Sequence, residues 1–99
     1  MVKKTLKNIE EVSIFLVNER LYIHNLVVET IMDCLINGDD NRVVIEFTMT
    51  DNDSVFRVNM GSKDWKESLN LSLDYFSLND NFEKCIQIRE LLKKIDEKI

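Results

Sequence analysis

The sequence predicts a single α+β domain over residues 1–99, in which a small antiparallel sheet carries a packed helix and a C-terminal antiparallel helical hairpin. Apolar residues recur every three or four positions near residues 26–37 and again after residue 63, which is the spacing of amphipathic helices. Between these stretches, residues 43–60 alternate between apolar and polar side chains, as strands do. The length of 99 residues and the 44% hydrophobic content are typical of one globular domain.

Residues 9–24 permit two interpretations. The segments 12–17 and 21–24 could form a hairpin that completes the sheet. A helix that begins at Thr5 would instead place four apolar residues on one face: Leu6, Ile9, Val12 and Leu16. The β-branched and aromatic residues of segment 12–17 favour a strand there.

A helix is expected over about residues 26–37. Asn25 is a suitable N-cap, Glu29 lies near the positive end of the helix dipole, and Gly38 stands where a left-handed C-cap residue is usually glycine. The apolar face of this helix is wide, which predicts burial on more than one side. It comprises Val27, Val28, Ile31, Met32, Cys34, Leu35 and Ile36.

The alternating residues that follow predict a β-hairpin, closed by the turn-forming segment 51–54. One side of the ribbon collects its apolar residues: Val43, Ile45, Phe47, Met49, Phe56, Val58 and Met60. Because an isolated two-stranded ribbon is only marginally stable, a helix or a further strand must cover that side.

Two helices complete the chain. Residues 63–78 fit both the strand and the helix spacing, but Ser62, Asp64 and Glu67 at its start favour a helix. The pattern over 81–98 is the most regular, since its apolar residues are three and four positions apart in turn: Cys85, Ile88, Leu92, Ile95 and Ile99. The short polar segment between the two helices predicts an antiparallel hairpin.

The last helix carries an aromatic–acid pair, Phe82-Glu83, and an Arg–acid pair, Arg89-Glu90, ahead of the aliphatic residues Leu92 and Ile95. In these features the C-terminal third resembles the UVR motif of the excision-repair proteins UvrB and UvrC, which is a two-helix hairpin. Cys85-Ile86 stands where that family has two small residues. The resemblance implies an element that pairs with another helical hairpin, and it implies no catalysis.

Composition excludes several functional classes. The 13 Lys and Arg residues against 18 Asp and Glu give a formal charge of −5, which disfavours direct nucleic-acid binding. No segment approaches the ~20 apolar residues of a membrane span, and the basic N-terminus lacks the apolar run and cleavage site of an export signal. We therefore expect a cytoplasmic protein without membrane association. The absence of Ala and Pro indicates AT-rich coding DNA, as in a phage or mobile element.

The sequence offers no catalytic or metal-binding constellation. Segment 51–62 begins like a calcium loop, but Phe56 replaces the required glycine and Ser62 the final glutamate. Cys34 and Cys85 lie outside any disulfide or zinc motif, and the sole histidine, His24, could activate one of them only through a tertiary contact. We therefore expect neither an enzyme nor a cofactor or metal site.

Two groups of residues are candidates for contact with a protein partner. The helix at 63–78 carries two apolar stripes, more than one neighbouring element can cover. The candidates there are Trp65, Leu71, Tyr75 and Leu78, of which Trp65 is either a core residue or an interface anchor. The second group is acidic and lies at the two ends of the first hairpin strand, about 25 to 30 Å apart. It comprises Asp39, Asp40, Asp51 and Asp53, which either solvate their loops or contact a basic partner.

These features together predict a small acidic, non-enzymatic protein that binds and inhibits or modulates a larger protein, as phage inhibitors and immunity proteins do. A basic or nucleic-acid-binding target would complement the acidic loops. Two alternatives remain open. One is a nucleic-acid-associated or repair-related interaction module, which the UVR resemblance and the basic chain ends support. The other is a structural homodimer.

Overall fold

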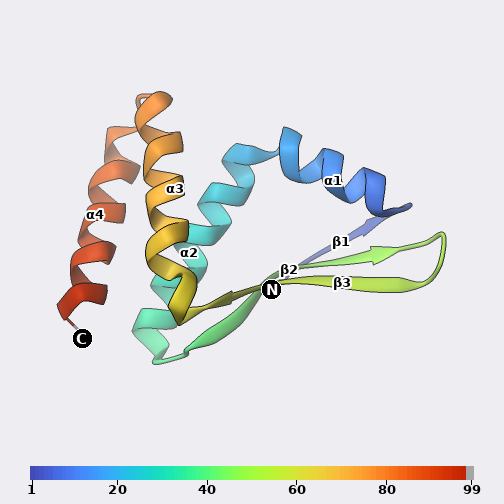
Figure 1. Ribbon diagram of the computed structural model, residues 1–99, viewed down its shortest axis with the longest axis horizontal. Helices are drawn as coiled ribbons and strands as arrows, with labels where there is room; N and C mark the ends of the chain where they lie inside the picture. Colours follow the sequence, from blue (N-terminus) through green and yellow to red (C-terminus); the bar gives the residue numbers. More distant parts are fainter. Residues whose placement is uncertain (98–99) are drawn as a thin grey trace.

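The predicted α+β class is confirmed by the computed structural model, which describes residues 1–97 (Figure 1). Three strands and four α-helices follow one another in the described chain. In chain order they are β1 (Val2–Leu6), α1 (Ile9–Asn18), α2 (Arg20–Asn37), β2 (Asn41–Met49), β3 (Ser54–Gly61), α3 (Trp65–Leu78) and α4 (Phe82–Glu97), with a 3-10 turn at Ser62–Asp64 before α3.

The sheet has the order β1-β2-β3 and is mixed rather than antiparallel. Its β2–β3 part is the predicted antiparallel hairpin, with Phe47 opposite Phe56. The unpredicted strand β1 pairs parallel to β2, with Lys4 opposite Phe47. Parallel neighbours require a crossover connection, and α1 with α2 supplies it.

Segment 12–17 is helical, so the prediction of a strand there was wrong. The side chain of Asn8 accepts a hydrogen bond of 3.0 Å from the Glu11 N–H, and Glu10 also lies in the first turn, where the helix dipole favours acids. Val12, Phe15 and Leu16 pack on the sheet at helical spacing. Tertiary packing thus overrides the strand propensity of these residues.

The remaining helices follow the predicted pattern, with one shifted boundary. Helix α2 begins at Arg20, so Asn25 lies inside the helix instead of capping it. Gly38 ends α2 in the left-handed region, with φ 74°, as predicted. Helices α3 and α4 form the expected hairpin and lie side by side at the end of the molecule away from the β2–β3 turn (Figure 1). The last residue of the predicted apolar stripe, Ile99, is outside the described residues.

The buried side chains form two clusters that meet at an irregularity in β2. The helical core joins α2, α3 and α4 to the near end of the hairpin, and it contains Val28, Ile31, Cys34, Val44, Met60, Trp65, Leu69, Phe76, Cys85, Ile88 and Leu91. The sheet core lies beneath α1 and contains Val12, Ile45, Phe47 and Met49. The register of β2 against β3 shifts between Val43 and Ile45. The consecutive residues Val44 and Ile45 are therefore both buried, one in each core.

Candidate functional site

A surface groove lies between α3 and the helical segment formed by the end of α1 and the first half of α2. Its volume is about 440 Å³, and we call it the α2–α3 groove. It is lined by Leu16, Arg20, Ile23, His24, Leu71, Tyr75, Leu78 and Asn79. Three of the four partner-contact candidates on α3 therefore share one concave surface: Leu71, Tyr75 and Leu78.

The α3 wall of the groove is strongly apolar and open to solvent. Leu71 is 59% exposed and Leu78 is 85% exposed. They belong to the second stripe of α3, because the first stripe, with Leu69 and Phe76, is fully buried in the helical core. One helix cannot bury two stripes against a single layer of neighbours, so the second stripe remains on the surface.

His24 connects the two walls of the groove. Its Nδ1 lies 2.7 Å from the Ser72 hydroxyl oxygen, and its ring stacks on Tyr75 with 4.5 Å between centroids. Burial, and secondarily the positive charge of Arg20, lower the pKa of His24, which favours the neutral imidazole. Ser72 is only 1% exposed. The His24–Ser72 pair therefore holds α2 against α3, and a substrate in the groove could not reach the hydroxyl.

Trp65 lies apart from the groove, at the start of α3. The structure places it in the helical core, where its Nε1 has no hydrogen-bond partner among the described residues. It also lines a cavity of about 420 Å³ that brings together Cys34, Leu35, Gly38, Asp39, Asp40, Ser62, Lys63, Trp65 and Ile95. Of the two alternatives for Trp65, a core residue or an interface anchor, the structure therefore supports the core residue.

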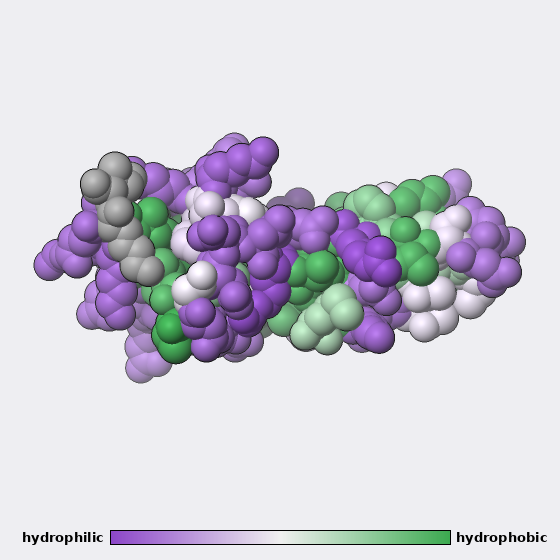
Figure 2. Space-filling view, turned by 90° about the horizontal axis from the view of Figure 1, so that it is seen from below, coloured by the Kyte–Doolittle hydropathy of each residue, from purple (hydrophilic) through white to green (hydrophobic). Residues whose placement is uncertain are grey.

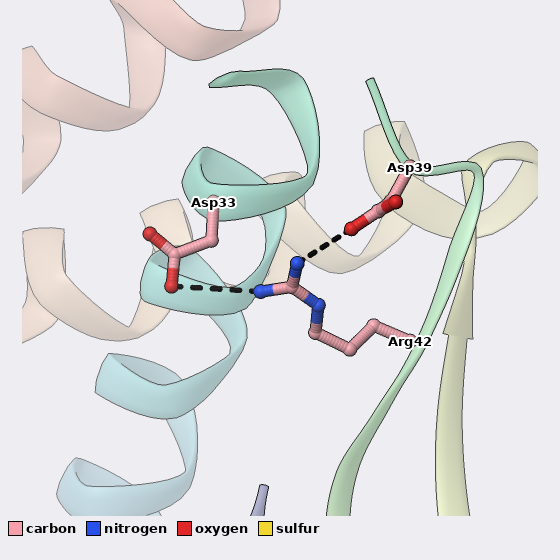
Figure 3. Close-up of polar contacts among 3 residues, drawn as sticks. All are labelled: Asp33, Asp39 and Arg42. Carbon is pink, nitrogen blue, oxygen red and sulfur yellow. Dashed lines mark hydrogen bonds and ion pairs between the residues drawn. The ribbon is translucent and has the colours of Figure 1, made fainter. Parts of the chain in front are cut away.

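The acidic candidates lie at opposite ends of β2, as predicted. Asp39 accepts a hydrogen bond of 2.5 Å from Arg42, and Asp33 lies 3.7 Å from the same guanidinium (Figure 3). The bond to Asp39 raises the pKa of Arg42. This cluster ties the end of α2 to β2, so Asp39 is engaged within the chain. Asp40 beside it is exposed, and Asp51 and Asp53 are exposed in the β2–β3 turn.

Sequence reasoning missed the wall of the groove that α1 and α2 provide. Leu16, Arg20 and Ile23 are spaced as one face of a helix, but the interpretation of residues 12–24 as strands separated them. A helix that begins at Arg20 places Ile23 and His24, three and four positions further on, on the same side as Arg20. The signal was present, and the competing strand propensity concealed it.

The two cysteines are buried and serve the helical core. Burial raises the pKa of the Cys34 thiol, which opposes thiolate chemistry. The Sγ of Cys85 lies 3.4 Å from the Ser77 hydroxyl. Within residues 1–97, no group of three or more His, Cys, Asp or Glu side chains could hold a metal ion, and no helix is long and apolar enough to cross a membrane.

Comparisons of the chain with known protein families, with curated proteins and with solved structures found no match in any of the three. The candidate function therefore rests on the geometry of the α2–α3 groove.

Proposed function

We propose that this protein is a small acidic, non-enzymatic binding protein that inhibits or modulates a larger protein in the cytoplasm. The observation that carries the proposal is the exposed pair Leu71 and Leu78 beside an apolar groove. Contiguous apolar surface on a small protein commonly marks a site of protein contact.

The groove suits part of a folded partner better than a small metabolite. One wall is α3 and the other is the end of α1 with the start of α2, and the residues along each wall recur at helical spacing: Leu16, Arg20 and Ile23 on one side, and Leu71, Tyr75 and Leu78 on the other. Such walls match an amphipathic helix with apolar anchors three and four residues apart. The overall charge of −5 would speed association with a basic target.

The test compares capture of a target by three forms of the immobilised protein. Leu71→Asp with Leu78→Asp places two charges on the groove wall, and Ile9→Asp with Ile36→Asp places two charges on exposed positions elsewhere. We expect the wild type and the second variant to capture the same host protein, and the first variant to lose it. Circular dichroism checks that both variants fold. Equal capture by both variants would exclude the groove as the binding site.

A second candidate is the repair-related interaction module that the UVR resemblance implies. The observation in its favour is that Phe82 and Ile86, one turn apart on α4, are both exposed. This hypothesis expects Phe82→Asp with Ile86→Asp to abolish capture of a partner that carries a helical hairpin, while the groove variant retains it. Direct nucleic-acid binding is not expected. Submicromolar affinity for a labelled oligonucleotide, measured by fluorescence anisotropy at ~150 mM salt, would overturn the ranking of the two candidates.

A further inference from the structure

The two edges of the sheet differ in how they are protected. The β1 edge carries Lys3 and Lys4, and charged side chains of this kind discourage pairing with another strand. The β3 edge carries one charged residue, Arg57, whose Nε donates a 2.7 Å hydrogen bond to Glu46 of β2. Val55 and Phe56 beside it are 46% and 41% exposed. The β3 edge is therefore apolar and open.

The hairpin also extends away from the helices that could have covered this edge. In Figure 1, β3 is the lowest element of the arm that leads to the β2–β3 turn. Seen from below, apolar and neutral atoms lie on this arm on both sides of a hydrophilic group, and its tip is hydrophilic (Figure 2). A Cβ added at Gly61 would have no atom within 4 Å, so the sheet face at the other end of β3 is open at that residue.

The hydrogen bonding of the hairpin indicates which backbone groups of β3 point outward. The Ser62 N–H donates to the Asp40 carbonyl at 2.8 Å, which makes the pair Asn41 and Gly61 a non-hydrogen-bonded one. The irregularity in the ladder adds a residue to β2, so the alternation along β3 is unbroken. The peptide groups of Val55 and Arg57 therefore point away from β2 and have no partner strand within residues 1–97.

We propose that a second copy of this chain pairs with β3 through its own β3, antiparallel, with Phe56 facing Phe56 of the second copy on the twofold axis. In this register Val55 of each copy lies opposite Arg57 of the other. Each of these two pairs exchanges two backbone hydrogen bonds. The two Phe56 residues form a non-hydrogen-bonded pair, in which side chains are closest, so each ring covers the other. The product is one continuous sheet through both copies. This inference is independent of the proposed function, since the α2–α3 groove lies elsewhere.

The charges beside β3 favour this arrangement. Antiparallel pairing about Phe56 brings the β2–β3 turn of each copy, which carries Asp51 and Asp53, to the end of β3 of the other copy, where Lys63 follows. A parallel arrangement would set Asp53 against Asp53. The acidic turn of each copy thus complements Lys63 of the other, which makes a second copy a fitting occupant of the β3 edge.

Sedimentation velocity over a concentration series, with crosslinking, tests the pairing. The wild type should change from monomer to dimer as its concentration rises. Phe56→Cys should form a disulfide-linked dimer under mild oxidation, because facing residues of such a pair are about 4.5 Å apart at Cα, within reach of a disulfide. Asn59→Cys, which is also exposed, is the matched control, since its two copies would lie about 20 Å apart along the strands. It should not crosslink.

A charge exchange tests the register without changing the apolar contact. Asp51→Lys alone would place a positive charge near Lys63 of the other copy and should weaken the dimer about twofold to tenfold, because symmetry doubles the effect of one charge pair. The double variant Asp51→Lys with Lys63→Asp should restore the dimer dissociation constant to within about twofold of the wild-type value. A wild type that remains monomeric at the highest concentration would overturn the proposal. So would a dimer that Phe56→Cys does not crosslink, or one that Leu71→Asp with Leu78→Asp dissociates while the charge exchange has no effect.

Discussion

The helical core and the sheet core are built from residues of the same kinds, yet they differ in how completely they enclose them. In the helical core, Ile31, Leu69 and Phe76 are fully buried between three helices and the hairpin. In the sheet core, α1 contributes only Val12 as a buried residue and leaves Ile14 and Val17 exposed. A helix held by one side on a narrow sheet loses fewer contacts when it opens. We therefore expect α1 to be the less stable region and the helical core to determine global stability.

The largest expected effect comes from Phe76→Ala in the helical core. Removing a fully buried ring should lower the free energy of unfolding by about 3 to 5 kcal/mol, because the cavity cannot close between three helices. Urea denaturation followed by circular dichroism measures this. Leu78→Ala on the same helix is the control and should change stability by less than about 0.5 kcal/mol, since Leu78 is exposed. Similar losses for both variants would contradict the assignment of the two stripes of α3.

Val12→Ala tests the sheet core and should lower the free energy of unfolding by about 2 kcal/mol. The destabilisation should be confined to α1. Amide hydrogen exchange should therefore become faster in α1, while the exchange rates of the slowest amides of α4 change little under native conditions. Val17→Ala, on the exposed side of the same helix, should leave both unchanged. If α1 and α4 accelerate equally after Val12→Ala, the two cores unfold as one unit and the contrast between them fails.

Gly38→Ala changes the backbone of the helical side without removing a core side chain. Gly38 has φ 74° and open space around it, so an added methyl costs only the strain of the left-handed conformation, about 1 kcal/mol. Gly61→Ala is a matched control, because Gly61 also has open space but an ordinary φ of −95°. Thermal unfolding should separate the two, with a lower Tm for Gly38→Ala alone. A lower Tm for both would indicate a contact at Gly61.

The smallest effect is a pH dependence at the contact between α2 and α3. Because the pKa of His24 is lowered in the folded state, the unfolded chain binds the proton more readily. Stability should therefore be complete above the unfolded pKa of about 6.5 and decline as the pH falls through it. The Tm difference between pH 7.5 and pH 5.5 should be smaller in His24→Gln, which keeps a hydrogen-bonding group beside Ser72. An unchanged difference would mean that other groups cause the loss.

The candidate site was only half visible in the sequence. The exposed stripe of α3 could be inferred from Leu71, Tyr75 and Leu78, because the excess of apolar residues on one helix is a local property. The opposing wall could not, since it required residues 12–24 to be recognised as helical. Its composition favoured a strand and its spacing allowed a helix, and the sequence-based prediction followed the composition.

Local patterns by themselves determined the β2–β3 hairpin, the α3–α4 hairpin and the end of α2 at Gly38, because each depends on residues that are neighbours in the chain. Tertiary structure alone decided that α1 is a helix, that β1 joins the sheet in parallel and that Val44 and Ile45 turn to different cores. The physical reason is the range of the interactions. A cap or a turn is stabilised within a few residues, whereas β1 gains its hydrogen bonds from a strand some 40 residues away, and α1 gains its stability from the sheet that this pairing creates.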